Sequence, residues 1–251
     1  MNTGQPLVGR VALVTGGGGG IGSAICRRLA QAGAHIVITY AHDQAKAEAV
    51  RDSLPAGQHL VIQAAVDDSA AQAALAARVA ADYGRLDILV NNAGVTRPVP
   101  HDDLDALSDE LIDTIFRVNV RGALASVRAM KTLLLASGDG LIVNISSVAA
   151  RIALGSNVAY CASKAALDNL TLSLARALAP TIRVLSVAPG WVEGEYAQRM
   201  PPQLIQQQRD LTPLGRIASA EDVAEAVYAA AVHLRFSTGT IIAVDGGRPL
   251  R

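Results

Sequence analysis

Hydrophobic positions along this chain fall into two alternating patterns. Short runs rich in Val, Ile and Leu are typical of buried strands, and the longer Ala-rich stretches between them carry apolar residues at helical spacing. The runs predict strands at 11–15, 35–39, 60–63, 86–90, 141–145, 183–187 and 240–244. The stretches predict helices at 21–32, 44–53, 70–83, 109–135, 156–178 and 220–232.

The regular alternation of strands with helices predicts an α/β fold. Strands buried on both faces and joined by helical crossovers form a parallel sheet, and right-handed crossovers place helices on both of its faces. The chain has no proline-rich or charged linker and no repeat of fixed period. We therefore expect one Rossmann-type doubly wound domain over 1–251, with a seven-stranded parallel sheet flanked by helices.

Two of the predicted helices are apolar on more than one side. The stretches 109–135 and 156–178 leave little polar surface, with Val120 and Leu124 in the first and Leu170 in the second. A helix that is apolar all round is usually buried on two sides. One side can face the sheet and the other a second subunit, so we expect a homo-oligomer.

Composition restricts the class of protein further. Hydrophobic residues make up 51% of the 251 residues and charged residues 18%, which supports a large core and excludes a disordered chain. The 22 Lys and Arg residues balance the 22 Asp and Glu residues, so no net positive field attracts nucleic acid or an anionic membrane. We expect neither of these partners.

The cysteines and the beginning of the chain bear on location. Cys26 and Cys161 each lie in an apolar, helical segment, which suits reduced thiols better than a disulfide framework. The first residues lack the basic and apolar regions of a signal peptide, and no run approaches about 18 uninterrupted apolar residues. We expect a cytoplasmic protein.

A glycine-rich turn joins the first predicted strand to the first predicted helix. From position 15 the sequence reads T-G-G-G-G-G-I-G, in which Gly16, Gly20 and Gly22 fit the pattern T-G-x-x-x-G-x-G, while another register fits G-x-G-x-x-G. Glycines let the backbone approach a pyrophosphate, whose charge is stabilised by the amides and dipole of the helix. In a βαβ unit such a turn predicts a dinucleotide site.

The end of the second predicted strand bears on which dinucleotide binds. NAD sites commonly place an acidic residue there to bind the ribose hydroxyls. This chain has Thr39-Tyr40-Ala41-His42-Asp43, and Asp43 is better placed to cap the next helix. Thr39 and His42 could instead accept a 2′-phosphate, so NADP(H) is favoured over NAD(H).

Candidate chemistry lies in the predicted helix 156–178, which contains Tyr160-x-x-x-Lys164. Residues four apart share a helix face, so the charge of Lys164 lies beside Tyr160 and favours its phenolate form. Tyr160 is therefore a candidate acid/base. Ser146 and Ser147 follow the fifth predicted strand, at the carboxyl edge where open α/β sheets bind ligands, and either hydroxyl could hold a substrate oxygen.

With these residues in place, the sequence resembles the short-chain dehydrogenase/reductase family over nearly its whole length, closest in pattern to the 3-oxoacyl-acyl-carrier-protein reductase branch. The matching motifs are the turn at 15–22, Asn91-Asn92-Ala93-Gly94, Asn119, Ser147, Tyr160-x-x-x-Lys164, Pro189-Gly190 and Val244-Asp245-Gly246-Gly247. The resemblance implies an NAD(P)(H)-dependent oxidoreductase that transfers hydride between nicotinamide and a carbonyl or secondary alcohol. It also favours a homotetramer.

The resemblance implies a catalytic role for each of four residues. Tyr160 exchanges a proton with the substrate oxygen, and Ser147 hydrogen-bonds that oxygen. Lys164 binds the nicotinamide ribose, and Asn119 holds a water that completes a proton relay. Ser147 is preferred to Ser146 because its interval to Tyr160 is the usual one in the family. The implied cofactor-binding residues are Gly16, Gly20, Ile21, Gly22, Tyr40, His42, Val66, Asn92, Ala93, Gly94, Tyr160, Lys164, Pro189, Gly190 and Val192.

The chain departs from the family pattern in three places. Ala65-Val66, followed by Asp67, stands where the family usually has Asp-Val in contact with adenine. Gly194 stands where the family often has a threonine that holds the nicotinamide amide, and Gly19 stands where many NADPH-preferring relatives have a basic residue. We expect the contacts to adenine and nicotinamide to be weaker or differently arranged.

The expected substrate lid is the segment 193–216, with Trp191 beside it either lining the pocket or simply packing. Its apolar and amide side chains suggest a small or medium carbonyl or alcohol rather than a highly charged one. An acidic carrier protein would need basic residues near the mouth, whereas 137–140 and 179–181 are poor in charge. A small free ketone or alcohol is favoured, with a 3-oxoacyl-acyl-carrier-protein reductase as the alternative.

Two further expectations concern metals and loss of catalysis. The histidines show no metal-ligand spacing with cysteine or with one another, so we expect no metal site. A catalytically silent nucleotide-sensing protein is the alternative from another class, and the presence of all four catalytic candidates argues against it.

Overall fold

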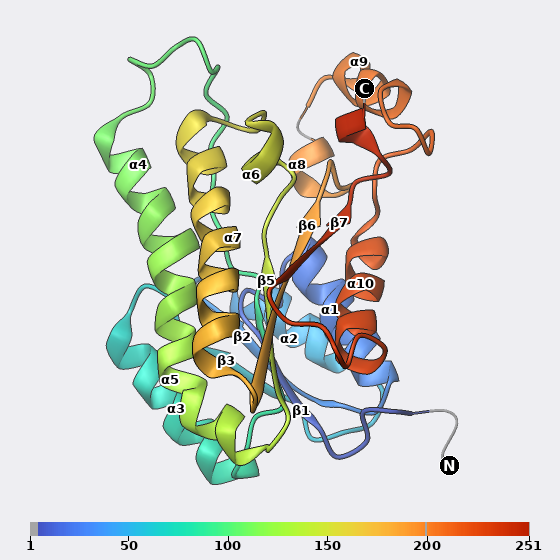
Figure 1. Cartoon of the computed structure of the whole chain (residues 1–251). Coiled ribbons are helices and arrows are strands. Elements are labelled where there is room, and N and C mark those ends of the chain that lie inside the picture. Colours follow the sequence, from blue (N-terminus) through green and yellow to red (C-terminus); the bar gives the residue numbers. More distant parts are fainter. Residues whose placement is uncertain (1–4, 199, 251) are drawn as a thin grey trace.

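Seven parallel strands form one sheet, with the order β3-β2-β1-β4-β5-β6-β7 (Figure 1). The chain is described here from a computed structural model that covers residues 5–198 and 200–250. The strands are β1 (Val11–Val14), β2 (His35–Tyr40), β3 (Leu60–Gln63), β4 (Ile88–Asn91), β5 (Gly140–Ile145), β6 (Ile182–Pro189) and β7 (Thr240–Val244). The strand order reverses between β1 and β4, which is the point where open α/β sheets bind ligands.

Helices cover both faces of the sheet and confirm the predicted doubly wound α/β class (Figure 1). One layer holds α1 (Gly20–Gln31), α2 (Gln44–Asp52) and α10 (Ala220–Val232). The other holds α3 (Ser69–Tyr83), α4 (Asp109–Phe116), α5 (Ala123–Ala136) and α7 (Val158–Leu178). Short helices that the sequence did not predict lie beyond the carboxyl ends of the strands: α6 (Ala149–Ile152), α8 (Glu195–Gln198), α9 (Pro202–Asp210) and the 3-10 turn η2 (Arg248–Leu250).

Side-chain alternation along the central strand explains the two layers. Ala12 and Val14 belong to the core beneath α1 and α10, whereas Val11 and Leu13 belong to the core beneath α3, α5 and α7. Successive side chains of a strand point to opposite faces, so a strand buried on both sides supplies two cores. The parallel register, with Leu13 opposite Val37, carries this division across the sheet.

The predicted helix 109–135 is interrupted. Between α4 and α5 the chain forms a π-helical segment, η1 (Arg117–Gly122), which contains Asn119. A Cβ atom at Gly122 would lie 2.6 Å from Cγ2 of Val66, so the helix passes very close to the loop after β3. Single π-helical turns inside α-helices are frequent at functional sites.

The catalytic-candidate helix α7 begins at Val158, two residues later than predicted. Asn157 caps it: its Oδ1 accepts a hydrogen bond from the backbone amide of Tyr160 at 2.7 Å. Asparagine is a favoured residue at this position because its side chain satisfies an amide that has no partner within the helix. The cap therefore fixes the first turn, in which Tyr160 lies.

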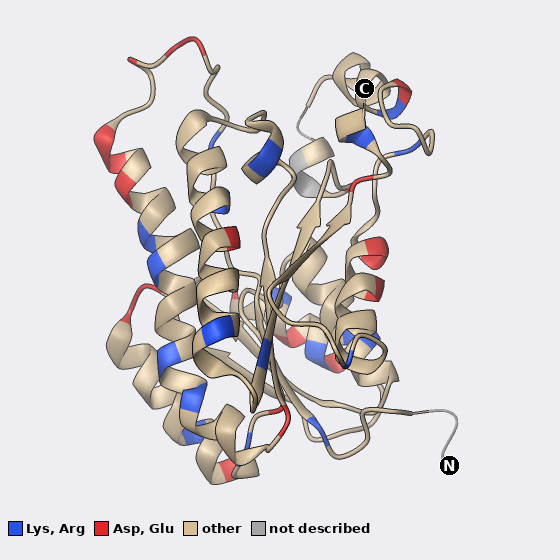
Figure 2. Cartoon of the chain, in the orientation of Figure 1, with Lys and Arg blue, Asp and Glu red and all other residues tan. Residues whose placement is uncertain are grey.

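Residues of both charge signs are distributed along the helices and loops (Figure 2). This distribution agrees with the balanced composition of 22 Lys and Arg and 22 Asp and Glu residues. Within 5–198 and 200–250, no helix combines the length and apolar character needed to cross a membrane. Residue 199, in the predicted lid 193–216, lies outside the described residues.

Candidate active site

The glycine turn after β1 requires glycine for two different reasons. Gly16 has φ +63°, in the left-handed region, and a Cβ at Gly22 would lie 2.5 Å from the carbonyl oxygen of Gly16. These two glycines allow the turn itself. In contrast, a Cβ at Gly20 would meet nothing within 4 Å, so the structure has no internal need for glycine there.

The open space at Gly20 lies at the N-terminus of α1, where an anion could bind. The cap residue of α1 is Gly19, which has no side chain that could accept from the first amides of the helix, and the first turn of α1 has no acidic residue. Helix N-terminal amides without internal partners, together with the helix dipole, favour phosphate groups. These features fit the pyrophosphate of a dinucleotide.

The loop after β4 is hydrogen-bonded to the glycine turn. The hydroxyl of Thr15 accepts hydrogen bonds from the amides of Asn92 and Ala93, both at 3.0 Å. Asn92 Nδ2 donates to the carbonyl oxygens of Thr15 at 2.9 Å and Gly16 at 3.1 Å. Asn92 therefore holds the two loops together at the switch point of the sheet.

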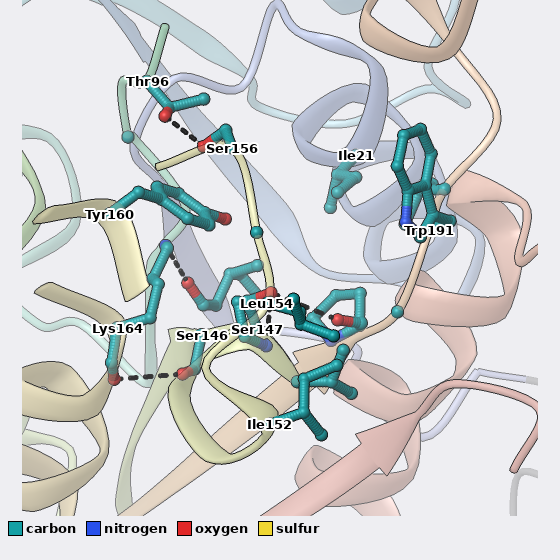
Figure 3. A pocket seen from close by; sticks show the side chains of 18 of the residues that line it. Ile21, Thr96, Ser146, Ser147, Ile152, Leu154, Ser156, Tyr160, Lys164 and Trp191 are labelled. Carbon is teal, nitrogen blue, oxygen red and sulfur yellow. Dashed lines mark hydrogen bonds between the residues drawn. The ribbon is translucent and has the colours of Figure 1, made fainter. Parts of the chain in front are cut away.

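Tyr160 and Lys164 project from the same face of α7 into a cavity (Figure 3). Lys164 Nζ lies 5.6 Å from the centre of the Tyr160 ring and donates a hydrogen bond to the carbonyl oxygen of Ile145 at 2.8 Å. Lys164 is buried, with 6% of its surface exposed. Burial lowers the pKa of Lys164 to about 8, an effect that the charge of Asp168 opposes.

The two serines after β5 differ in environment. Ser146 is buried, and its hydroxyl donates to the carbonyl oxygen of Lys164 at 3.3 Å. The hydroxyl of Ser147, which is half-buried, accepts from the amide of Ala149 at 3.2 Å and approaches the Pro189 carbonyl oxygen at 3.5 Å. Both residues line the cavity, but Ser147 is half-buried whereas Ser146 is buried, so the hydroxyl of Ser147 is the more accessible of the two. This geometry favours Ser147 as the substrate contact.

Asn119 is buried in η1 and connects two parts of the site. Its Oδ1 accepts from the Val95 amide at 2.8 Å, and its Nδ2 donates to the Val95 carbonyl at 3.1 Å and to Ser163 Oγ at 3.2 Å. The side chain thus holds the loop after β4 against α7. These bonds make Asn119 a positioning residue, and the water-holding role implied by the family resemblance stays a prediction.

The cavity has a volume of about 550 Å³ and lies over the carboxyl ends of the strands. The predicted residues that line it are Ile21, Asn92, Gly94, Ser147, Tyr160, Lys164, Pro189, Gly190 and Val192. Those outside its lining are Gly16, Gly20, Gly22, Tyr40, His42, Val66, Ala93 and Asn119. Trp191 forms the wall opposite Tyr160 (Figure 3). The sequence analysis missed the lining residues Thr96, Ile152, Leu154, Ser156, Gln208 and Arg248.

The end of β2 offers exposed rather than buried groups for a ribose or phosphate. Thr39 is 0% exposed, so its hydroxyl is not accessible to a 2′-phosphate in this conformation. Tyr40 donates to Gln44 Oε1 at 3.0 Å, and His42 is exposed. Asp43 accepts from the Lys46 amide at 3.0 Å and caps α2, as predicted.

Two departures from the family pattern have structural consequences. Asp67 accepts a hydrogen bond from Arg117 Nε at 3.1 Å, so its carboxylate is paired with η1. Gly194 has φ +146°, a conformation that L side chains rarely adopt. A threonine at Gly194 would therefore be strained in this conformation.

No cluster of three His, Cys, Asp or Glu side chains that could hold a metal occurs in the described part of the chain. The ionisable groups that line the cavity are Tyr160, Lys164 and Arg248. The site therefore presents hydroxyl groups and cations to a ligand, with no carboxylate among the described lining residues.

Comparisons with known proteins agree with this geometry. A family model described as enoyl-(acyl carrier protein) reductase matches residues 16–248. The putative ketoacyl reductase 2 of the granaticin polyketide synthase, from Streptomyces violaceoruber, is 38% identical over 96% of this chain and 96% of its own length. The cis-4-hydroxycyclohexanecarboxylate dehydrogenase of Sinomonas cyclohexanicum is 37% identical over 97% of this chain and 98% of its own.

Further matches include a member of the predicted reductase branch and a solved structure with the same fold. A 3-oxoacyl-[acyl-carrier-protein] reductase from Staphylococcus aureus is 34% identical over 94% of this chain and 96% of its own. A crystal structure of a putative short-chain dehydrogenase/reductase from Burkholderia xenovorans is 35% identical, with a TM-score of 0.90 over 96% of this chain and 98% of that one. The chain therefore belongs to the short-chain dehydrogenase/reductase family of nicotinamide-dependent oxidoreductases that act on carbonyl groups and alcohols.

Proposed function

We propose that this enzyme interconverts a small free ketone and its secondary alcohol, with Tyr160 as the acid/base. The observation that carries the proposal is the convergence of Tyr160, Lys164 and Ser147 on one cavity at the carboxyl edge of the sheet. When bound, the nicotinamide cofactor supplies the hydride that the carbonyl carbon accepts. The protein's own side chains bind and orient the substrate and transfer the proton.

Proton transfer follows from the placement of these groups. In reduction, the phenol of Tyr160 gives its proton to the substrate oxygen, while the hydroxyl of Ser147 donates a hydrogen bond to that oxygen. The ammonium of Lys164, 5.6 Å from the Tyr160 ring centre, stabilises the phenolate that remains. In alcohol oxidation the same groups act in reverse, because Tyr160 then takes the proton.

The cofactor we favour is NADP(H). Its pyrophosphate would bind at the α1 N-terminus beside Gly20, where the space is open. Tyr40 and His42 lie at the end of β2, and the carboxylate of Asp43 is engaged as a helix cap. Comparison of the dissociation constants of NADP⁺ and NAD⁺ by calorimetry tests this preference, and equal values would refute it.

A small free substrate fits the charge-poor surroundings better than an acyl group on a carrier protein. We propose that the segment 193–216 forms a lid over the cavity, because Gln208 of this segment lines the cavity. Among the relatives, one is named for a small hydroxycyclohexane acid and others for ketoacyl groups, so a 3-oxoacyl-acyl-carrier-protein reductase is the second candidate. The homotetramer and the cytoplasmic location stay predictions.

Steady-state oxidation of NADPH and of NADH, followed by absorbance with a panel of ketones, diketones and 3-oxoacyl thioesters, tests the proposal. We expect turnover of small ketones with NADPH. Turnover of carrier-bound thioesters alone would favour the second candidate. Absence of turnover in both directions, with measurable cofactor binding, would contradict the catalytic proposal.

A further inference from the structure

Arg248 differs from Arg209 and Arg216 because it has no acidic partner among the described residues. Arg209 lies 3.5 Å from Glu193, and Arg216 pairs with Asp222 at 2.8 Å. Within 5–198 and 200–250, the partner of the Arg248 guanidinium is Gln208, whose Oε1 is 3.3 Å from both Nε and Nη2. A half-buried guanidinium is thus held by a neutral amide.

The acidic residue nearest to Arg248 in sequence is already engaged. Asp245 Oδ1 accepts a hydrogen bond from the amide of Gly247 at 2.8 Å, which forms the turn before Arg248. The amide of Arg248 in turn donates to the carbonyl oxygen of Asp245 at 3.1 Å. The carboxylate therefore stabilises the turn and leaves the charge of Arg248 uncompensated by this neighbour.

The position of Arg248 is set by contacts between the C-terminal turn and the segment after α9. The amide of Leu214 donates to the Gly246 carbonyl at 3.1 Å, and a Cβ at Gly246 would lie 2.6 Å from Cγ2 of Thr212. Gln208 is buried, with 8% of its surface exposed. Arg248 of η2 and Gln208 of α9 thus form one polar unit in the lining of the cavity. Figure 1 shows α9 well separated from α7.

The rest of the cavity makes this unit unusual. Ile21, Val148, Ile152 and Leu154 contribute apolar surface, and no Asp or Glu is among the described lining residues. Gln208 occupies the Nε edge of the guanidinium, which leaves the N–H groups at its Nη end for a second acceptor. A carboxylate matches two adjacent N–H groups, and in an apolar surrounding it needs such a partner.

We infer that the substrate of this enzyme carries a carboxylate, which Arg248 binds while Gln208 orients the guanidinium. The inference rests on the proposed function, because it names the chemical class of the ketone or alcohol reduced or oxidised at Tyr160. The substrate is thus an oxo acid or hydroxy acid, with its carbonyl or hydroxyl group separated from the carboxylate by an apolar body.

Calorimetry on the protein saturated with NADP⁺ tests the inference without turnover. The probes are levulinate, oxocyclohexanecarboxylate and their uncharged methyl esters. We expect the wild type to bind at least one acid about 10-fold or more tightly than its ester, and Arg248→Gln to weaken that binding by about 10- to 100-fold. Ester and NADP⁺ binding should change less than about 3-fold.

Two further variants separate a carboxylate site from a packing role. Gln208→Glu gives Arg248 an internal counter-ion and should remove the preference for the acid while the charge of Arg248 remains. Arg209→Gln is the matched control, because it removes a lid arginine that pairs with Glu193, and it should leave the preference intact. Thermal unfolding of each variant confirms that it is folded.

Several results would overturn the inference. In one such result, the wild type binds none of the acids more tightly than the corresponding ester, or binds neither acid nor ester. Another is an equal loss of acid and ester binding in Arg248→Gln. A loss of NADP⁺ binding in that variant would instead assign Arg248 to a cofactor phosphate. Turnover of ketones without any preference for acids would leave the proposed function standing and refute this inference alone.

Discussion

Replacement of Lys164 by methionine separates the stability of the fold from its chemistry. The pKa of Lys164 falls from 10.5 to about 8 because the ammonium is buried. One pKa unit corresponds to about 1.36 kcal/mol, so an ionised lysine at this position costs the fold about 3 kcal/mol at pH 7. Lys164→Met removes this cost and also removes the only buried ammonium among the described residues.

The sign of the pH dependence follows from proton binding. Between pH 8 and 10.5 the unfolded chain holds a proton on Lys164 that the folded chain has lost, so the free energy of unfolding of the wild type rises with pH. The variant lacks this contribution. Its stability relative to the wild type should therefore fall by about 2 kcal/mol between pH 7 and about pH 9.5.

Urea unfolding of both proteins at fixed concentration measures this difference. At pH 7 the variant should be at least about as stable as the wild type, because the roughly 3 kcal/mol gain is offset by about 1–3 kcal/mol for the Ile145 carbonyl left without its donor. Lys131→Met, at an exposed position, controls for the loss of a charge as such. A stability difference for Lys164→Met that is independent of pH would show that burial does not lower the pKa of Lys164, whatever the activity.

Four other variants test separate features of the protein. Gly22→Ala brings a Cβ to 2.5 Å from a backbone oxygen and should abolish cofactor binding measured by calorimetry. Gly20→Ala should weaken cofactor binding but leave thermal unfolding unchanged, because its Cβ would meet nothing within 4 Å. Asp87→Asn should lower the free energy of urea unfolding by about 3 kcal/mol, because its carboxylate is buried and accepts from two arginines; a loss below about 1 kcal/mol would contradict this. Asn157→Ala removes the cap on the Tyr160 amide and should cost about 1 kcal/mol with a lower kcat, and an unchanged kcat would remove its positioning role.

The fold was predictable because its determinants are local. The strand segments are apolar on both faces, and the helical segments carry apolar residues at helical spacing. The pattern of hydrophobic residues within each segment is therefore enough to tell strands from helices. The interruption of 109–135 was not predictable in this way. Its last residue, Gly122, lies against Val66, which is far away in sequence and fills the place where a Cβ of Gly122 would lie.

The candidate site was predictable where its residues directly follow strands or share a helix face. Ser147 and Tyr160 are of this kind, and both line the cavity. Gln208 and Arg248 were missed because their contact depends on how the C-terminal turn packs against α9. The engagement of Asp67 by Arg117 was likewise invisible, since ion pairs between distant segments leave no periodic pattern.

In the proposed reaction a hydride reaches a carbonyl carbon while Tyr160 supplies the proton. The direct measurement is mass spectrometry of the alcohol formed from a ketone with cofactor deuterated at C4 of the nicotinamide, for the wild type and for Tyr160→Phe. We predict one deuterium at the carbinol carbon in the wild type and a loss of turnover of about 100-fold or more in the variant, with cofactor affinity retained. An unlabelled alcohol with both the pro-R and the pro-S deuterated cofactor, or unchanged turnover by Tyr160→Phe, would contradict this mechanism.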